Sequence, residues 1–199
     1  MMKVFDNHPK HHIVTMVYNF ILMQTSQSYL LRVSEFNSIK TLIQSMDQRS
    51  YDKSYMLSGL RCLTNLSMKN IISTKIGEYG GIQLLHSIIR GNVHNESIII
   101  ECLRILKNMT MDNSTNSNKI IQNGLANTML RVLITYSQHE IIQQKAHDFI
   151  LNLFIFSDLL KKAIPMETLQ LLKISSRTTN LFPDQYRKLF YMVDNIGNK

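Results

Sequence analysis

The residues best suited to chemistry in this chain are five asparagines that recur at nearly constant spacing. They stand 46, 43, 44 and 43 residues apart, each within a similar apolar segment: Asn19, Asn65, Asn108, Asn152 and Asn195. A side-chain amide offers hydrogen-bond donors and an acceptor together. Recurrence at a fixed period marks a repeat protein, so we expect the five amides to occupy equivalent places in successive units.

A second set of residues stands four places before each asparagine. Residues four apart share one face of a helix, so these side chains would lie beside the amides. Two of them are arginines, whose guanidinium groups can hold a carboxylate or a phosphate through paired hydrogen bonds. In chain order the five residues are Thr15, Arg61, Arg104, Asp148 and Tyr191. The central pair therefore favours an anionic ligand.

Residues suited to catalysis or metal binding do not converge. His8, His11 and His12 have no cysteine or carboxylate partner at a fixed spacing, which favours a solvated leader over a metal site. His147 and Asp148 are neighbours in sequence, yet successive residues of a helix point about 100° apart, so they do not form a catalytic pair. We therefore predict no enzymatic activity, no cofactor and no metal.

Each asparagine lies on a segment with the apolar spacing of an α-helix. Apolar residues stand three and two places before it and one place after it, which is the buried stripe of a long helix. Six places before it, the three central copies carry a small residue, where a neighbouring helix could approach closely: Gly59, Cys102 and Ala146. The pattern predicts one long helix in every repeat.

A glycine marks a second feature of the repeat. Gly80 and Gly124 lie 44 residues apart, each preceded by a Lys-Ile pair and followed by apolar residues at the second, fifth, eighth and ninth places. Glycine suits a sharp corner between helices because it adopts positive φ at almost no cost. Each unit is expected to hold a short helix, this corner, a medium helix, a loop and the long helix. Ser34 takes the glycine position in the first copy, and Pro165 falls near it in the last.

With these two signatures the chain resembles the armadillo-repeat proteins, whose units carry a glycine corner and a small-x-x-apolar-apolar-x-Asn-apolar third helix. The resemblance covers about residues 10–197 and is most specific in the two central units. It implies an all-α fold, a right-handed superhelical solenoid and a single domain over residues 1–199. The expected divisions are a partial unit at 8–25, units at about 26–68, 69–111 and 112–156, and a final unit at about 157–197. A HEAT-type pair of helices is the nearest structural alternative.

The resemblance also implies a binding groove. In armadillo proteins the long helices line a concave surface, and their asparagine amides hold the backbone of an extended peptide. The nuclear-import receptors of the family carry Trp four places before the asparagine, and this chain has no Trp. We therefore expect a basic groove, closer in kind to that of β-catenin, that binds an acidic or phosphorylated protein segment. The implied residues are Arg61, Asn65, Arg104, Asn108, Asp148 and Asn152 in the groove, with Asn19, Tyr191 and Asn195 at its periphery.

The alternative for these residues is that the asparagines brace the helices and the arginines are merely solvated. Alternatives for the whole chain are a structural subunit that packs through outer helix surfaces, and electrostatic binding to nucleic acid. The net charge of +8 favours acidic partners without identifying them. Lys and Arg are scattered over all the expected helices, which makes nucleic acid the weaker alternative.

Composition agrees with an all-α globular chain. Of its 199 residues 44% are hydrophobic, and only seven are Gly and three Pro, too few for a sandwich or barrel of many tight turns. Cys62 and Cys102 are expected to be buried thiols on long helices, which indicates a reducing compartment, cytoplasmic or nuclear. The apolar run at 13–23 contains Tyr18 and Asn19 and lacks a cleavage site, so we do not expect a signal peptide. No apolar run approaches the roughly 20 residues of a membrane span.

Overall fold

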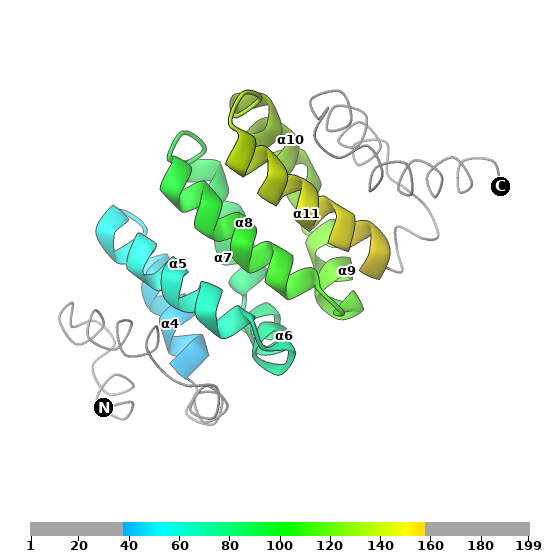
Figure 1. Cartoon of the computed structure of the whole chain (residues 1–199). Helices are drawn as coiled ribbons and strands as arrows, with labels where there is room; N and C mark the ends of the chain where they lie inside the picture. The colour runs from blue at the N-terminus through cyan, green and yellow to red at the C-terminus, as the bar shows by residue number, and fades with distance from the viewer. Residues whose placement is uncertain (1–37, 158–199) are drawn as a thin grey trace. The chain divides into compact units, whose positions relative to one another are not determined.

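The computed structural model describes residues 38–157, and every regular element in that range is an α-helix (Figure 1). This confirms the predicted all-α class. No described helix combines the length and the apolar character that crossing a bilayer requires. The helices are α4 Ser38–Gln48, α5 Lys53–Ser67, α6 Asn70–Glu78, α7 Gly81–Gly91, α8 Glu96–Thr110, α9 Ser114–Gln122, α10 Leu125–Thr135 and α11 Glu140–Phe156.

The chain divides into two compact units, residues 1–109 and 110–199. The described part of the first unit holds α4, α5, α6, α7 and nearly all of α8, and that of the second holds α9, α10 and α11. The predicted end units, Ser34 and Pro165 lie outside the described residues. Each unit is considered by itself below.

The helices repeat with the period that the sequence predicts. The helices α9, α10 and α11 begin 44 residues after α6, α7 and α8, at 114, 125 and 140 against 70, 81 and 96. In the same way, α8 begins 43 residues after α5, which starts at 53. A short helix of 9 residues, a medium one of 11 and a long one of 15 or 17 thus follow one another twice.

The two predicted glycine corners separate the short helix from the medium one. Gly80 has φ 90° and stands directly before α7, and Gly124 has φ 74° and stands directly before α10. Positive φ is strained for residues with a Cβ, so glycine stabilises both corners. A polar side chain caps the start of α5, where a carboxylate oxygen of Asp52 accepts from the backbone N–H of Tyr55 at 3.0 Å.

The expected apolar stripe is the core. On α8 the positions three and two before Asn108 and one after it, namely Ile105, Leu106 and Met109, are fully buried. The small residues also act as predicted, because a Cβ added to Gly59 on α5 would come within 2.6 Å of the Met46 sulfur on α4. Cys102 and Ala146, the small residues of α8 and α11, are fully buried as well. The long helices therefore turn their apolar side inward and leave their polar side for other contacts.

Candidate functional site

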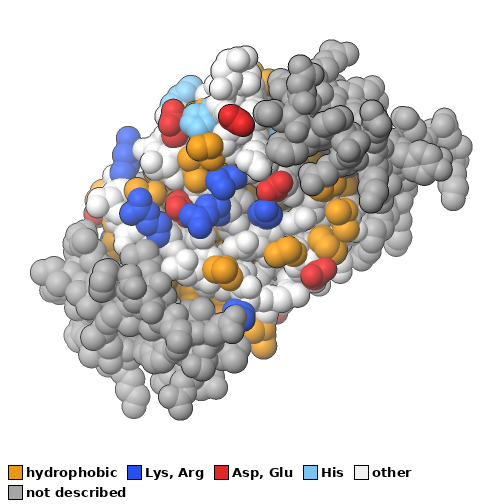
Figure 2. All heavy atoms as spheres, viewed as in Figure 1, with side chains coloured by type: hydrophobic (Ala, Val, Ile, Leu, Met, Phe, Trp, Pro, Cys, Tyr) orange, Lys and Arg blue, Asp and Glu red, His pale blue; other side chains and the backbone are white. Residues whose placement is uncertain are grey.

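The polar sides of α5 and α8 form the candidate site of the first unit. The two long helices run side by side (Figure 1) and are joined by hydrogen bonds between their side chains. Lys and Arg side chains gather on this side of the molecule, with single acidic side chains among them (Figure 2). We call it the α5–α8 face and define it by Ser58, Arg61, Asn65, Glu101, Arg104 and Asn108.

Asn108 braces α8 against α5. Its Nδ2 donates to the backbone oxygen of Thr64 at 3.3 Å and to Ser67 Oγ at 3.0 Å, and Ser67 Oγ in turn donates to the Thr64 oxygen at 2.8 Å. The amide orientation is fixed, because only its nitrogen can donate to a carbonyl. Both N–H groups are therefore engaged, and the Oδ1 acceptor is the part of this half-buried side chain that a ligand can use.

Glu101 is a member of the α5–α8 face that the asparagine register does not reveal. Its Oε2 accepts from Thr64 Oγ1 at 2.8 Å, and its Oε1 accepts from Arg104 Nη1 at 3.3 Å. The Glu101 side chain is 12% exposed, whereas that of Arg104 is 49% exposed. An acid three places before Arg104 on the same helical face is the signal that points to this ion pair in the sequence. The burial of Glu101 depends on packing against α5, so the sequence around Glu101 does not reveal it.

Arg61 occupies on α5 the place that Arg104 occupies on α8, but its surroundings differ. It is exposed, and within residues 38–157 its guanidinium has no hydrogen-bonding or ionic partner. The residue three places before it is Ser58, where α8 has Glu101. Asn65, four places after Arg61, is half-buried and makes contacts of its own. The structure thus leaves both predicted arginines exposed on adjacent long helices, in unequal electrostatic settings.

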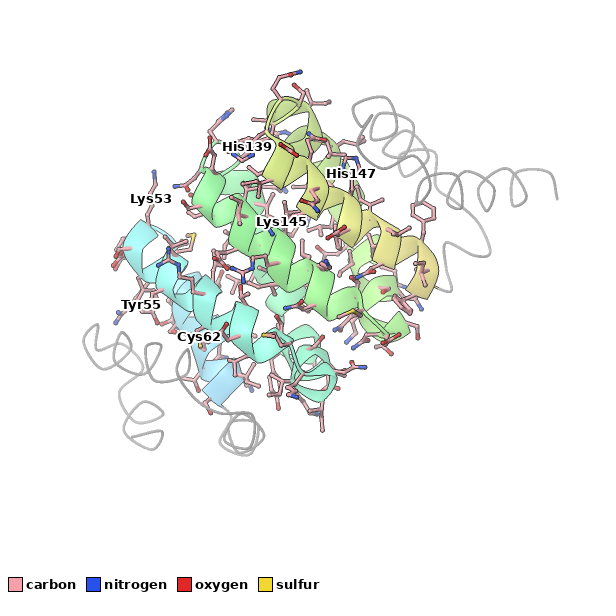
Figure 3. All side chains as sticks on the ribbon, viewed as in Figure 1. Lys53, Tyr55, Cys62, His139, Lys145 and His147 are labelled. Atoms are coloured by element: carbon pink, nitrogen blue, oxygen red, sulfur yellow. The ribbon has the colours of Figure 1, made fainter. Side chains whose placement is uncertain are left out.

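In the second unit, Asp148 and Asn152 lie one turn apart on α11, and both are half-buried. His147 points elsewhere: it is buried, and its Nδ1 shares a hydrogen bond with the backbone oxygen of Gln143 (Figure 3). A buried imidazole beside a half-exposed carboxylate gives no exposed acid–base pair. The predicted peripheral residues Asn19, Tyr191 and Asn195, like His8, His11 and His12, lie outside the described residues.

The two cysteines are poor nucleophiles. Both are fully buried free thiols. Burial raises the pKa of Cys62 far above its usual range, and burial together with the nearby Glu101 charge raises that of Cys102. Because the thiolate is the reactive form, neither thiol suits catalysis. Among residues 38–157, no group of three or more His, Cys, Asp and Glu side chains is arranged to hold a metal ion.

Comparison with known protein families places the chain among helical repeats. A family model described as CCP1-like, N-terminal TPR repeats matches residues 11–180. TPR-like repeats generally mediate protein–protein interactions. A TPR unit has two helices and a period of about 34 residues, and the match is not to armadillo repeats, so the armadillo resemblance remains a prediction. No curated protein and no solved structure matches the chain. Since the family match extends over most of its length, the chain belongs to the family of CCP1-like, N-terminal TPR repeats.

Proposed function

We propose that this chain is a non-enzymatic protein-interaction module whose α5–α8 face binds an extended segment carrying an acidic or phosphorylated residue. The observation that carries the proposal is the pair of exposed guanidinium groups, Arg61 and Arg104, on adjacent long helices beside half-buried amides. Membership of a repeat family that generally mediates protein–protein interactions supports the general class. The free thiols of Cys62 and Cys102 support a reducing location, cytoplasmic or nuclear.

We also propose that the repeat units are armadillo-like in kind. Helices that recur 44 residues apart in groups of three support this, because a period of about 40–47 residues and two or three helices is typical of HEAT and armadillo repeats. The left-handed glycines Gly80 and Gly124 at the corner between the first two helices support the armadillo form over a HEAT-type pair.

The binding energy of such a face is modest. Exposed ion pairs contribute up to about 1 kcal/mol each, so two arginines together change a dissociation constant by at most about 30-fold. The rest must come from hydrogen bonds to the ligand backbone, for which Asn108 Oδ1 is the acceptor that the α5–α8 brace leaves available. Because α5 and α8 are already packed together, the receptor loses little conformational entropy on binding.

The test is a peptide array probed with the full chain and with the Arg61→Glu/Arg104→Glu double variant. The matched control is Arg90→Glu/Arg131→Glu, which makes the same change of net charge at two exposed arginines of α7 and α10. We expect the preference for acidic and phosphorylated peptides to disappear in the first variant and to persist in the control. An unchanged preference in both variants overturns the proposal, and an equal loss in both indicates attraction to net charge alone.

Packing through outer helix surfaces into a larger assembly has less support. Among the described residues, the large apolar side chains exposed on the short and medium helices are Ile71 on α6 and Ile134 on α10, one on each helix. Single exposed apolar residues are normal on protein surfaces and do not indicate an interface. Nucleic-acid binding would appear in the same experiment as a steep loss of affinity with salt toward any polyanion, including one without a peptide backbone.

A further inference from the structure

Two arginines that the repeat places at equivalent positions are electrostatically different. Arg61 and Arg104 lie 43 residues apart on α5 and α8, each four places before an asparagine. Three places before Arg104 stands Glu101, whose carboxylate lies 3.3 Å from the guanidinium, whereas three places before Arg61 stands Ser58, a neutral residue. One positive charge is therefore offset within the protein, and the other is offset by none of the described residues.

The Glu101 carboxylate is held in place from both helices. Thr64 on α5 donates to one of its oxygens at 2.8 Å, and Arg104 on α8 donates to the other at 3.3 Å. At 12% exposure this side chain has little access to water, so turning away from both donors would leave a poorly solvated charge without partners. An anionic ligand group that approaches Arg104 must therefore also approach the fixed negative charge of Glu101, which repels it.

The distance between α5 and α8 sets how many ligand residues separate the contact with Arg61 from the contact with Arg104. Packed helices lie roughly 8–10 Å apart, and an extended peptide advances about 3.3 Å per residue, so a peptide that crosses α5 and α8 meets the two arginines about three residues apart. Arg104 retains N–H groups beyond the one given to Glu101, and these can donate to a neutral acceptor such as a hydroxyl or an amide oxygen.

We infer that Arg61 binds the anionic group of the ligand and that Glu101 makes the Arg104 position selective for a neutral residue. This inference rests on the proposed function. The α5–α8 face would thus accept an extended segment with one carboxylate or phosphate opposite Arg61 and an uncharged polar residue about three positions away. Glu101 is a positioning and neutralising residue, and Arg61 and Arg104 are the groups that contact the ligand.

The experiment uses ten-residue Gly/Ser peptides that carry Glu or phosphoserine either once or twice, with the two acidic residues two to five positions apart. Fluorescence anisotropy gives dissociation constants for the full chain and its variants. The Glu and phosphoserine arms show whether the anion is a carboxylate or a phosphate. In the wild-type chain we expect a second acidic residue about three positions from the first to give no gain in affinity.

The variants separate the two arginines. We expect Arg61→Gln to weaken binding of the singly acidic peptide about fivefold, and Arg104→Gln to weaken it less than twofold. Glu101→Gln keeps an oxygen for the Thr64 hydroxyl, removes the negative charge, and should raise affinity for the doubly acidic peptide five- to tenfold. The matched control is Glu96→Gln, the same change at an exposed acid of α8, which should give no such gain.

A reciprocal variant keeps the inference testable if Glu101→Gln does not fold. Ser58→Glu places a carboxylate three residues before Arg61, on the half-buried polar side of α5, and should weaken binding of the singly acidic peptide about as much as Arg61→Gln does. Equal losses for Arg61→Gln and Arg104→Gln, or no effect of Ser58→Glu, would overturn the assignment while the face remains a peptide site. A wild-type chain that binds no acidic peptide at all refutes the proposed function itself.

Discussion

Replacing Asn108 by alanine tests whether this residue holds the repeats together. The substitution removes the hydrogen bonds from Asn108 Nδ2 to the Thr64 backbone oxygen at 3.3 Å and to Ser67 Oγ at 3.0 Å. The Thr64 oxygen keeps the Ser67 hydroxyl as a donor at 2.8 Å, so no buried acceptor is left unpaired. Two net hydrogen bonds at about 1 kcal/mol each, less up to about 0.7 kcal/mol for the better helix propensity of alanine, give an expected loss of about 1–2 kcal/mol.

Urea unfolding of the full chain, followed by helical circular dichroism, measures this loss. Asn108→Asp provides the discriminating comparison, because it puts an oxygen in place of the donating nitrogen and a negative charge in the last turn of α8. Both changes are unfavourable, so it should be less stable than Asn108→Ala. A double-mutant cycle with Ser67→Ala should give a coupling energy of about 0.5–1 kcal/mol. A stability of Asn108→Ala within about 0.3 kcal/mol of wild type would refute the brace and leave the side chain available to a ligand.

Other perturbations follow from burial and backbone geometry. Cys62 and Cys102 should react with a maleimide only after denaturation, with two labels per chain, and labelling of the folded chain at the rate of a free thiol would contradict their burial. Because the pKa values of both thiols are raised in the folded state, the folded chain holds their protons more tightly than the unfolded chain does. The stability is therefore full below the unfolded pKa of 9.0 and falls as the pH rises above it. The free energy of unfolding should therefore fall by about 1.4 kcal/mol per pH unit per thiol above that value, and a Cys62→Ala/Cys102→Ala variant should show a shallower slope. Gly81→Ala places a Cβ against Ile76 Cγ2 and 2.7 Å from the Ile76 backbone oxygen, and should lower stability by about 1–3 kcal/mol in thermal unfolding. On the same helix, Gly91→Ala meets open space and should raise stability by up to about 1 kcal/mol; equal effects of the two would show that the contact does not matter.

Most of the fold could be predicted because its signals are local. An apolar spacing of three to four residues defines a helix without knowledge of its neighbours, and a glycine that requires positive φ, as at Gly80 and Gly124, defines a corner. Two such signals recurring 44 residues apart predict the repeat. The kind of repeat is less determined, because the chain belongs to a family named for TPR units while its helices recur with the longer period.

The candidate site could be predicted only in outline, because its properties are non-local. Sequence spacing placed Arg61 and Arg104 at equivalent positions, but their difference comes from Glu101, and Glu101 is held by Thr64, 37 residues earlier in the chain. The partners of Asn108 are likewise 41 and 44 residues away, so no local pattern names them. A residue type that can serve as ligand clamp or as brace cannot be assigned to either use until its partners are known.

The brace at Asn108 gives a physical reason for an asparagine to recur. Apolar side chains on stacked helices tolerate small shifts, because dispersion contacts have little directional preference. A side-chain amide that must reach one carbonyl and one hydroxyl on the preceding long helix fits a single register, so it specifies how two repeats stack. Ligand selectivity is then expected from positions next to the asparagine on the helix whose residue type changes from repeat to repeat. The place four residues before the asparagine has this property, since it holds Arg61 on α5, Arg104 on α8 and Asp148 on α11. Exchanging the exposed Arg61 should alter which peptides bind and leave the stability of the stack nearly unchanged, whereas exchanging Asn108 should lower that stability.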